Sequence, residues 1–230
     1  MKIAIVNQKG GSGKSTTAVL LAKAFADAER PCVLVDCDPQ GGASALFGAQ
    51  ANPGLFDYLL EAHTAEACAH PIAGFAGLEL MPADFRLDAV FVSVDPFALK
   101  RLPFDQIIFD TAPTMQGLTR AAVVAADRVW IPSELSETAL GPTAYTVDQV
   151  RRLDKTPEVL LSGYRPPEDL KGTARDLAER FRETLGASII GTIPRNVSAA
   201  KMATRAGKWS KKTRELIEQP LLALASGGKR

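Results

Sequence analysis

Residues 1–16 read MKIAIVNQKGGSGKST, and this stretch decides the fold. Lys2–Val6 is a short apolar run rich in isoleucine and valine, which predicts a buried strand. The general phosphate-loop pattern G-x-x-x-x-G-K-[ST] would need a glycine at position 8, where this chain has Gln8. The chain instead carries the variant K-G-G-x-G-K-[ST], with an additional lysine, Lys9, at its front. The stretch therefore predicts a distinct type of phosphate-binding loop between a strand and a helix.

The residues of this loop suit a nucleoside triphosphate bound together with Mg²⁺. Glycines allow successive backbone N–H groups to point inward around phosphate oxygens, and the following helix presents its N-terminus to the negative charge. Lys14 would neutralise the β- and γ-phosphates, and the Ser15 hydroxyl would ligate the metal. Further nucleotide contacts are expected from Gly10, Gly11, Ser12, Gly13 and Thr16. The alternative is a glycine-rich turn without a ligand, but the lysine and hydroxyl in register favour a nucleoside triphosphate and Mg²⁺.

Composition places the chain among ordinary globular proteins. Of its 230 residues 46% are hydrophobic and 23% are charged, with a net charge of +1, which suits one domain over residues 1–230. The three cysteines lack metal-ligand spacing, which argues against a zinc site or a disulfide framework and favours a reducing cytosol. No apolar run approaches the roughly 18 residues of a membrane span, and the chain begins directly in a strand. We therefore expect a cytoplasmic domain without an added DNA-reading module at its N-terminus.

Apolar runs alternate with helical patterns along the chain, which predicts the α/β class. The expected fold is that of a P-loop NTPase, a largely parallel twisted sheet with helices on both faces. Strands are predicted over residues 2–6, 32–35, 78–81, 106–110, 128–131, 157–163 and 188–193. Helices are predicted over residues 16–29, 117–125, 137–153 and 170–185, with short helical pieces over 43–76 and two helical stretches after the last strand.

Two acidic motifs stand at the ends of apolar strands, where open α/β sheets bind ligands. Asp110 ends one strand and is placed to hold Mg²⁺ through a water, although it also suits a helix N-cap. Asp36 and Asp38 end the second strand. Taking alternate strand residues to point to opposite faces, we expect only one of the two to face the γ-phosphate. We assign Asp38, just before Pro39, to the attacking water and Asp36 to the metal shell.

Lys9 has no role in an ordinary phosphate loop, because Lys14 already serves the bound nucleotide; the alternative is a solvated loop lysine. Four segments together resemble the ParA/MinD family of deviant Walker A ATPases, and most of all its ParA partition branch. They are KGGSGKST (9–16), DCDPQG (36–41), DTAP (110–113) and IPRNV (193–197). The match runs in order along nearly the whole chain, and four motifs at compatible positions make it specific.

The resemblance implies a parallel α/β sheet and a face-to-face dimer driven by ATP. Lys9 would be the signature lysine that reaches across the dimer to the partner's phosphates, like an arginine finger supplied in trans. Residues 36–41 would form the first switch and residues 110–113 the second. Relatives often carry an adenine-contacting asparagine near the end of the sixth strand, where this chain reads LSGYR (161–165). Base recognition is then expected from Pro194 or from backbone groups.

The C-terminal region, about residues 195–220, concentrates positive charge. Between Arg195 and Arg214 the chain has no acidic residue, and basic residues follow i,i+3 and i,i+4 spacings that predict one stripe on a helix. The candidate DNA-binding residues are Arg195, Lys201, Arg205, Lys208, Lys211 and Lys212. The stripe is either a solvated helix face or a surface for DNA phosphates, and the resemblance favours DNA. Acids and a proline over 215–224 argue against a membrane-binding helix.

The resemblance implies an Mg²⁺-dependent ATPase, weak alone and stimulated by DNA and a partner, that segregates a plasmid or chromosome over the nucleoid. Its expected partners are a second copy in an ATP-dependent homodimer, nonspecific nucleoid DNA, and a ParB-like centromere-binding or cargo adaptor protein. Three alternatives remain open. They are a ParA-like ATPase that positions a protein cargo, a P-loop ligase or synthetase that activates a carboxylate with ATP, and a nucleotide-dependent scaffold without hydrolysis.

Overall fold

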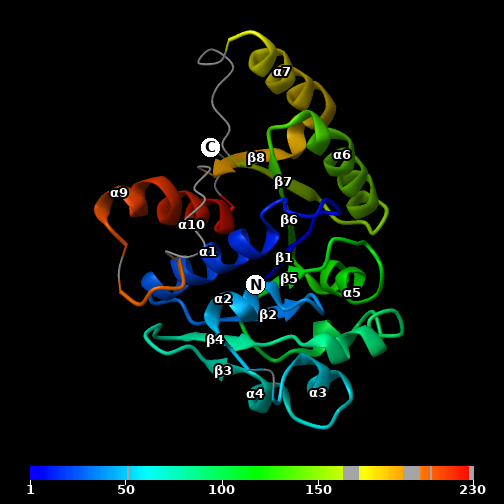
Figure 1. The fold of residues 1–230 in the computed structure, drawn as a ribbon, viewed down its shortest axis with the longest axis vertical. Coiled ribbons are helices and arrows are strands. Elements are labelled where there is room, and N and C mark those ends of the chain that lie inside the picture. The colour runs from blue at the N-terminus through cyan, green and yellow to red at the C-terminus, as the bar shows by residue number, and fades with distance from the viewer. Residues whose placement is uncertain (51, 163–170, 194–202, 208, 228–230) are drawn as a thin grey trace.

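The computed structural model describes residues 1–50, 52–162, 171–193, 203–207 and 209–227. In this part of the chain, eight strands form one sheet in the order β3-β4-β2-β5-β1-β6-β7-β8 (Figure 1). All neighbouring strands are parallel except β3 and β4. The strands are β1 (Lys2–Ile5), β2 (Cys32–Cys37), β3 (His70–Pro71), β4 (Leu78–Met81), β5 (Ile107–Thr111), β6 (Arg128–Glu134), β7 (Pro157–Ser162) and β8 (Ile189–Ile193). The predicted α/β fold with a largely parallel sheet is confirmed.

Helices of very different lengths connect these strands. The long ones are α1 (Lys14–Asp27), α5 (Gly117–Ala125), α6 (Glu137–Arg151) and α7 (Thr173–Leu185). The short ones are α2 (Gly42–Phe47), α3 (Leu55–Leu59), α4 (Ala65–Cys68), η1 (Phe85–Ala89), η2 (Ala98–Arg101), η4 (Gly186–Ser188), α9 (Lys211–Thr213), η5 (Arg214–Glu218) and α10 (Gln219–Ala225). Thus α1 begins two residues before the predicted Thr16. It also ends before the predicted Glu29, because that residue adopts a left-handed φ of 57° and turns the chain ahead of Pro31.

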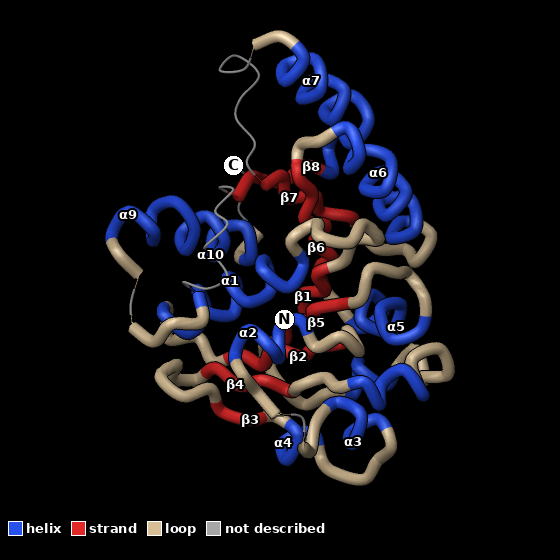
Figure 2. The backbone as a smooth tube through the Cα atoms, viewed as in Figure 1, coloured by secondary structure: helices blue, strands red, loops and turns tan. Residues whose placement is uncertain are grey.

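Both faces of the sheet are buried. Along β1, Ile3 and Ile5 join a core that includes residues of α1 and α10, whereas Ala4 and Val6 join a core built with α5 and α6. Figure 2 shows α1, α9 and α10 on one side of the sheet and α5, α6 and α7 on the other. Burial on two sides explains why the strands read as continuous apolar runs instead of alternating patterns. It also places β1, and the loop that follows it, at the centre of the molecule.

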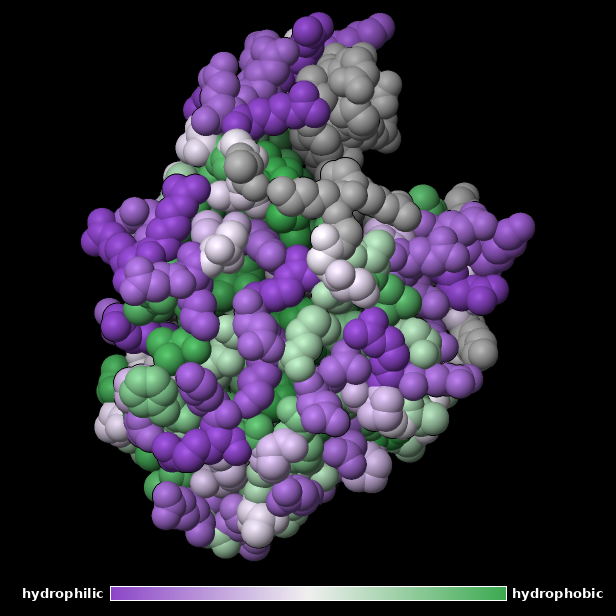
Figure 3. All heavy atoms as spheres, turned by 180° about the vertical axis from the view of Figure 1, so that it is seen from behind, coloured by the Kyte–Doolittle hydropathy of each residue, from purple (hydrophilic) through white to green (hydrophobic). Residues whose placement is uncertain are grey.

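The outer face of α7 is polar, as the purple surface at the top of Figure 3 shows. The helix buries Leu177, Ala178, Phe181 and Leu185. Ion pairs on its exposed side join Arg175 to Glu179 and Arg180 to Glu137. The mixed-charge helix predicted over residues 170–185 is therefore observed over 173–185, as an amphipathic cover for one edge of the sheet.

The predicted basic stripe on one helix is wrong for the part of it that the structure describes. Residues 204–207 form a turn and bends, residues 209 and 210 have no regular secondary structure, and α9 begins only at Lys211. Gly207 has a φ of 102°, which a helix cannot contain. Arg205 and Lys211 therefore lie on separate segments.

Among the described residues, no helix is long and apolar enough to cross a membrane.

Candidate functional site

The predicted site residues meet at the carboxyl ends of three adjacent strands. Ile5 on β1 pairs in register with Asp110 on β5, and Asp36 on β2 pairs with Asp110 from the other side. The loop that follows β1 leads into α1 at the same edge (Figure 1). Open parallel sheets bind ligands here, because strand ends and helix N-termini face one crevice. The strand order therefore brings together segments that lie far apart in the sequence.

The phosphate loop is open and lined with backbone donors. Gly11 and Gly13 have φ values of 72° and 92°, in the region that favours glycine. A Cβ added at either glycine would meet no atom within 4 Å. No side chain caps the N-terminus of α1, and its first turn contains no acidic residue. The buried Ser12 hydroxyl has no hydrogen-bond partner among the described residues. Such unserved donors at the N-terminus of a 14-residue helix fit a phosphate group.

Lys14 lies at the first position of α1 and is only 7% exposed. Burial lowers the pKa of its ammonium group, while the charges of Asp110 and Asp38 oppose this effect. Thr16 follows within the first turn of the same helix. Lys14 is thus a buried cation at the start of a helix that faces the acidic strand ends, as neutralisation of a bound triphosphate requires.

Asp110 is the most unusual acid of the site. It is completely buried, and neither carboxylate oxygen has a hydrogen-bond partner of good geometry among the described residues. Burial raises the pKa of this carboxyl well above its usual range; the charge of Asp36 raises it further, and the Ser15 hydroxyl and Lys14 lower it. A buried, unpartnered carboxylate beside a serine hydroxyl fits Mg²⁺, a cation that prefers oxygen ligands and completes its shell with waters and phosphates.

Asp36 is equally buried but well bonded. Its Oδ2 accepts hydrogen bonds from the Ser44 amide (2.8 Å) and hydroxyl (2.7 Å), and its Oδ1 accepts one from the Asp38 amide (3.1 Å). Burial raises its pKa to about 6, against the lowering effect of these hydrogen bonds. Asp110 is therefore the better placed of the two acids for direct or water-mediated metal binding, and Asp36 suits the outer part of the metal shell.

Asp38 lies just beyond the end of β2 and is half-buried. The predicted separation of Asp36 from Asp38 by strand alternation is wrong, because residues two apart on a strand point to the same face. The structure separates them because the strand ends at Cys37 and Asp38 begins a turn, in which its Oδ1 accepts the Gln40 amide. Asp38 borders a cavity of about 180 Å³ together with Ala112 of the predicted second switch and Thr114 just after it.

Lys9 points away from the start of α1. Its ammonium group pairs with Glu134 at the end of β6 and hydrogen-bonds to Thr138 in α6 (3.2 Å). Its amide donates to the buried side chain of Asn7 (2.9 Å). The structure thus gives the two loop lysines different surroundings within one chain. Sequence reasoning missed Glu134, although an acid at the carboxyl end of a parallel strand is the same signal that identified Asp110.

Of the candidate DNA-binding residues, the structure describes only some. Arg205 and Lys211 are exposed, and Lys212 belongs to α9. Arg195, Lys201 and Lys208, together with the adenine candidate Pro194, lie outside the described residues.

A buried lysine anchors the segment that carries Arg205. Lys23 on α1 pairs with Asp27 and donates to the carbonyl of Gly207 (2.8 Å). Its ammonium group lies 5.2 Å from the ring centres of both Phe75 and Trp209. Gly207 and Trp209 are therefore held against α1 by the hydrogen bond and the cation–π contact of Lys23, whose charge Asp27 balances.

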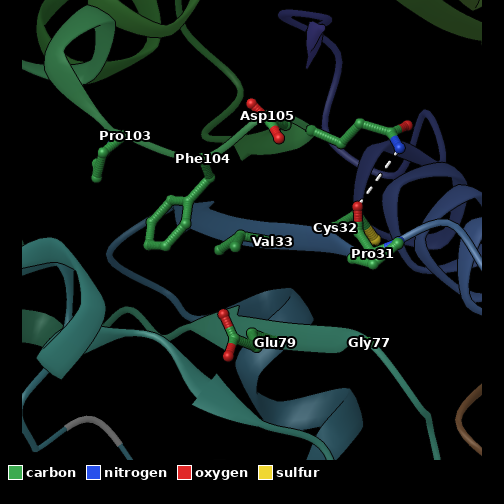
Figure 4. A pocket seen from close by; sticks show the side chains of 9 residues that line it. Pro31, Cys32, Val33, Gly77, Glu79, Pro103, Phe104 and Asp105 are labelled. Carbon is green, nitrogen blue, oxygen red and sulfur yellow. Dashed lines mark hydrogen bonds between the residues drawn. The ribbon is translucent and has the colours of Figure 1, made fainter.

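A larger pocket lies at the other end of the strands, at their amino ends. It has a volume of about 330 Å³ and is lined by the amino ends of β2 and β4 and by the segment before β5. Figure 4 shows the side chains of Val33, Phe104, Glu79 and Asp105 around it. None of the predicted site residues lines it. Pocket size alone would therefore point away from the nucleotide site.

Comparisons with known proteins agree with this geometry. The protein family described as "AAA domain" matches residues 1–161. The chain is 32% identical to the chromosome-partitioning ATPase Soj of Thermus thermophilus over 218 residues, covering 87% of this chain and 83% of Soj. It is also 32% identical to the chromosome partitioning protein ParA of Caulobacter vibrioides over 224 residues, covering 86% and 82% of the two chains.

Solved structures of low sequence identity share the fold. Apo McdA from Cyanothece superposes with a TM-score of 0.83 at 20% identity over 98% of both chains. A plasmid partition protein from Borrelia burgdorferi gives 0.73 at 22% identity, over 97% of this chain and 98% of that one. Cobyrinic acid a,c-diamide synthase from Mycobacterium smegmatis, with bound ADP and magnesium, gives 0.72 at 25% identity over 100% and 98%.

The family match covers most of the chain, and relatives at 32% identity cover more than four-fifths of it. Together with the phosphate loop at the centre of a parallel sheet, these matches establish the chain as a member of the ParA/Soj branch of the deviant Walker A P-loop ATPases.

Proposed function

We propose that this protein is an Mg²⁺-dependent ATPase that closes into an ATP-bound dimer, binds DNA without sequence preference and segregates a plasmid or chromosome. The observation that carries the proposal is the different placement of the two loop lysines. Lys14 is buried at the start of α1, whereas Lys9 extends to Glu134 and Thr138. Because Lys14 meets the loop's own need for a cation, Lys9 is left for a second set of phosphates, those of a facing subunit.

Within one subunit, the residues divide the work of phosphoryl transfer. Lys14, the loop amides and Thr16 hold the phosphates, and Ser15 and Asp110 hold Mg²⁺, with Asp36 behind them. The metal supplies charge neutralisation at the phosphate oxygens. Asp38 orients the attacking water next to the second switch. Little acid–base chemistry is needed, because this reaction depends mainly on positioning and charge stabilisation.

The dimer accounts for regulation. Each site is complete only when the partner's Lys9 adds its positive charge, so a single chain turns over slowly. The joint C-terminal surface, with Arg205 and Lys211 among its basic residues, binds nucleoid DNA through phosphates. A ParB-like centromere-binding or adaptor protein then stimulates hydrolysis and releases the dimer. The names of the Soj and ParA relatives, both tied to chromosome partitioning, support this reading.

A second function deserves a test, because the synthase from Mycobacterium smegmatis shares the fold at 25% identity. A ligase or synthetase of that type uses ATP to activate a small-molecule carboxylate, and its turnover would depend on that acid and ignore DNA. The 32% identity to partition proteins over most of the chain favours partition.

The deciding experiment measures ATP hydrolysis and oligomeric state on the same samples, with and without ATP, Mg²⁺ and plasmid DNA. We expect monomers without nucleotide, dimers with ATP, and DNA retention only of the dimer. ATP-independent oligomeric state together with turnover unaffected by DNA would contradict the proposal. Dimers that never release phosphate, even with the adaptor protein, would indicate a scaffold instead of an ATPase.

A further inference from the structure

A chain of hydrogen bonds joins the segment after β4 to the backbone of Asp38. The Ala83 amide donates to Ser44 Oγ (3.0 Å), and this hydroxyl donates to Asp36 Oδ2 (2.7 Å). The Ser44 amide donates to the same oxygen (2.8 Å). The other oxygen of Asp36 accepts the Asp38 amide (3.1 Å). Ser44 therefore holds one side of the Asp36 carboxylate, and the other side holds Asp38.

This relay is buried in the protein interior. Ser44 is 4% exposed and Asp36 is fully buried, where hydrogen bonds are strong and a missing partner is costly. The same short helix, α2, approaches the phosphate loop so closely that a Cβ at Gly42 would lie 2.8 Å from Ser15 Oγ. The helix that carries Ser44 thus lies against the hydroxyl proposed to bind the metal.

Hydrogen bonds in the turn after β2 also fix the Asp38 side chain. The Gly41 amide donates to the Asp38 carbonyl (2.7 Å), and the Gln40 amide donates to Asp38 Oδ1 (3.0 Å). With its own amide bound to Asp36, Asp38 is held at its amide, its carbonyl and its carboxylate. A shift of Asp36 would therefore move the carboxylate of Asp38 as well.

We propose that Ser44 is a positioning residue for ATP hydrolysis, which fixes Asp36 and through it the water-orienting carboxylate of Asp38. The inference rests on the proposed role of Asp38. Both the amide and the hydroxyl of Ser44 donate to Asp36. Ser44 can therefore affect hydrolysis only by fixing the position of that carboxylate. A substitution of Ser44 should therefore lower kcat more than it weakens the binding of ATP.

The test compares Ser44→Ala with Ser44→Thr, which keeps the hydroxyl. Hydrolysis is measured at saturating ATP and Mg²⁺ with plasmid DNA, well below the unfolding midpoint of each variant. Ser44→Ala should lower kcat roughly tenfold, as expected for the loss of one hydrogen bond to a charged group, with KM for ATP nearly unchanged. Ser44→Thr should restore kcat to within about twofold of the wild type. Ser188→Ala, which removes another buried serine that accepts a bond from Arg151, should leave kcat unchanged.

A double-mutant cycle separates this inference from the proposed function. If Ser44 acts through Asp38, adding Ser44→Ala to Asp38→Ala should cause no further loss of kcat. Losses that multiply, or a rise in KM with kcat intact, would overturn the relay. Wild-type turnover of Asp38→Ala would instead overturn the role of Asp38.

Amide hydrogen exchange over residues 36–41 gives a readout that does not depend on turnover. The exchange should be faster in Ser44→Ala than in Ser44→Thr, because the Asp38 amide loses its fixed acceptor. Equal exchange rates in the two variants would also count against the relay.

Discussion

Asp110→Asn should stabilise the metal-free protein at neutral pH and remove its response to Mg²⁺. Asp36 and Asp110 are buried side by side on neighbouring strands, and burial raises the pKa of both carboxyls. For Asp36 the pKa rises from 3.8 to about 6. Since one pKa unit corresponds to roughly 1.36 kcal/mol, the charged form of Asp36 costs the folded protein about 3 kcal/mol above pH 6.

The direction of the pH dependence follows from these raised pKa values. Between pH 3.8 and about 6, the Asp36 carboxyl binds more protons in the folded protein than in the unfolded chain. The free energy of unfolding of the metal-free protein should therefore fall as the pH rises through this window. Asp110, whose pKa is raised well above its usual range, extends the fall to higher pH. Asparagine at position 110 removes one of the two buried charges, so the fall should be smaller in the variant.

Urea unfolding in EDTA at about pH 4.5 and about pH 7.5 measures this difference. Added Mg²⁺ and ADP should recover the stability of the wild type at the higher pH but not that of Asp110→Asn, since ions that bind the folded state stabilise it. Asp105→Asn, at an exposed acid, serves as the matched control and should behave as the wild type. A metal-free wild type that is more stable at pH 7.5 than at pH 4.5 would refute the reasoning. So would a variant less stable than the wild type at pH 7.5.

Four further predictions concern lysines, their partners and the basic surface. Lys9→Ala should abolish hydrolysis stimulated by DNA and the adaptor protein, measured as phosphate release; wild-type turnover would exclude a role in trans. Glu134→Gln should strengthen the ATP-dependent dimer about fivefold in analytical ultracentrifugation, because it frees Lys9 from a partly exposed ion pair, which is worth up to about 1 kcal/mol. A weaker dimer would place Glu134 in the interface itself. Arg205→Glu with Lys211→Glu should reduce the salt dependence of DNA binding while ATP-driven dimers persist; unchanged retention on DNA would remove both residues from the surface. Lys23→Met should lower the free energy of unfolding by about 1–3 kcal/mol, because it leaves the partly buried Asp27 carboxylate and the Gly207 carbonyl without the donor they share. A loss well under 1 kcal/mol in urea would contradict the anchor.

Most strands were predictable because their signals are local. The apolar runs before Asp36 and Asp110 fold as β2 and β5, since strands buried on both faces need no polar positions. The wrong prediction of a basic stripe has an equally local cause. The i,i+4 spacing of lysines says nothing about a glycine between them, and Gly207 breaks the segment with its positive φ.

Other parts of the site had no signal in the sequence. Ser44 stands in an alanine-rich stretch, and only the packing of α2 on β2 brings its hydroxyl to Asp36. Likewise, the spacing of Lys9 and Glu134 along the chain gives no hint that they pair. They meet because β1 and β6 are neighbours in the sheet.

By itself, the sequence determined the phosphate loop, the αβ alternation and the family, because each motif and each apolar run is a short stretch that can be read without knowing the fold. The tertiary structure alone decided which groups surround the loop. The strand order places Asp110 between Asp36 and the loop, where neither oxygen of Asp110 has a hydrogen-bond partner among the described residues. Asp36, in contrast, accepts hydrogen bonds from Ser44 and from the Asp38 amide. Two similar carboxylates thereby acquire different roles. The reason is that residues distant in the sequence decide how deeply each carboxylate is buried and which hydrogen bonds it accepts.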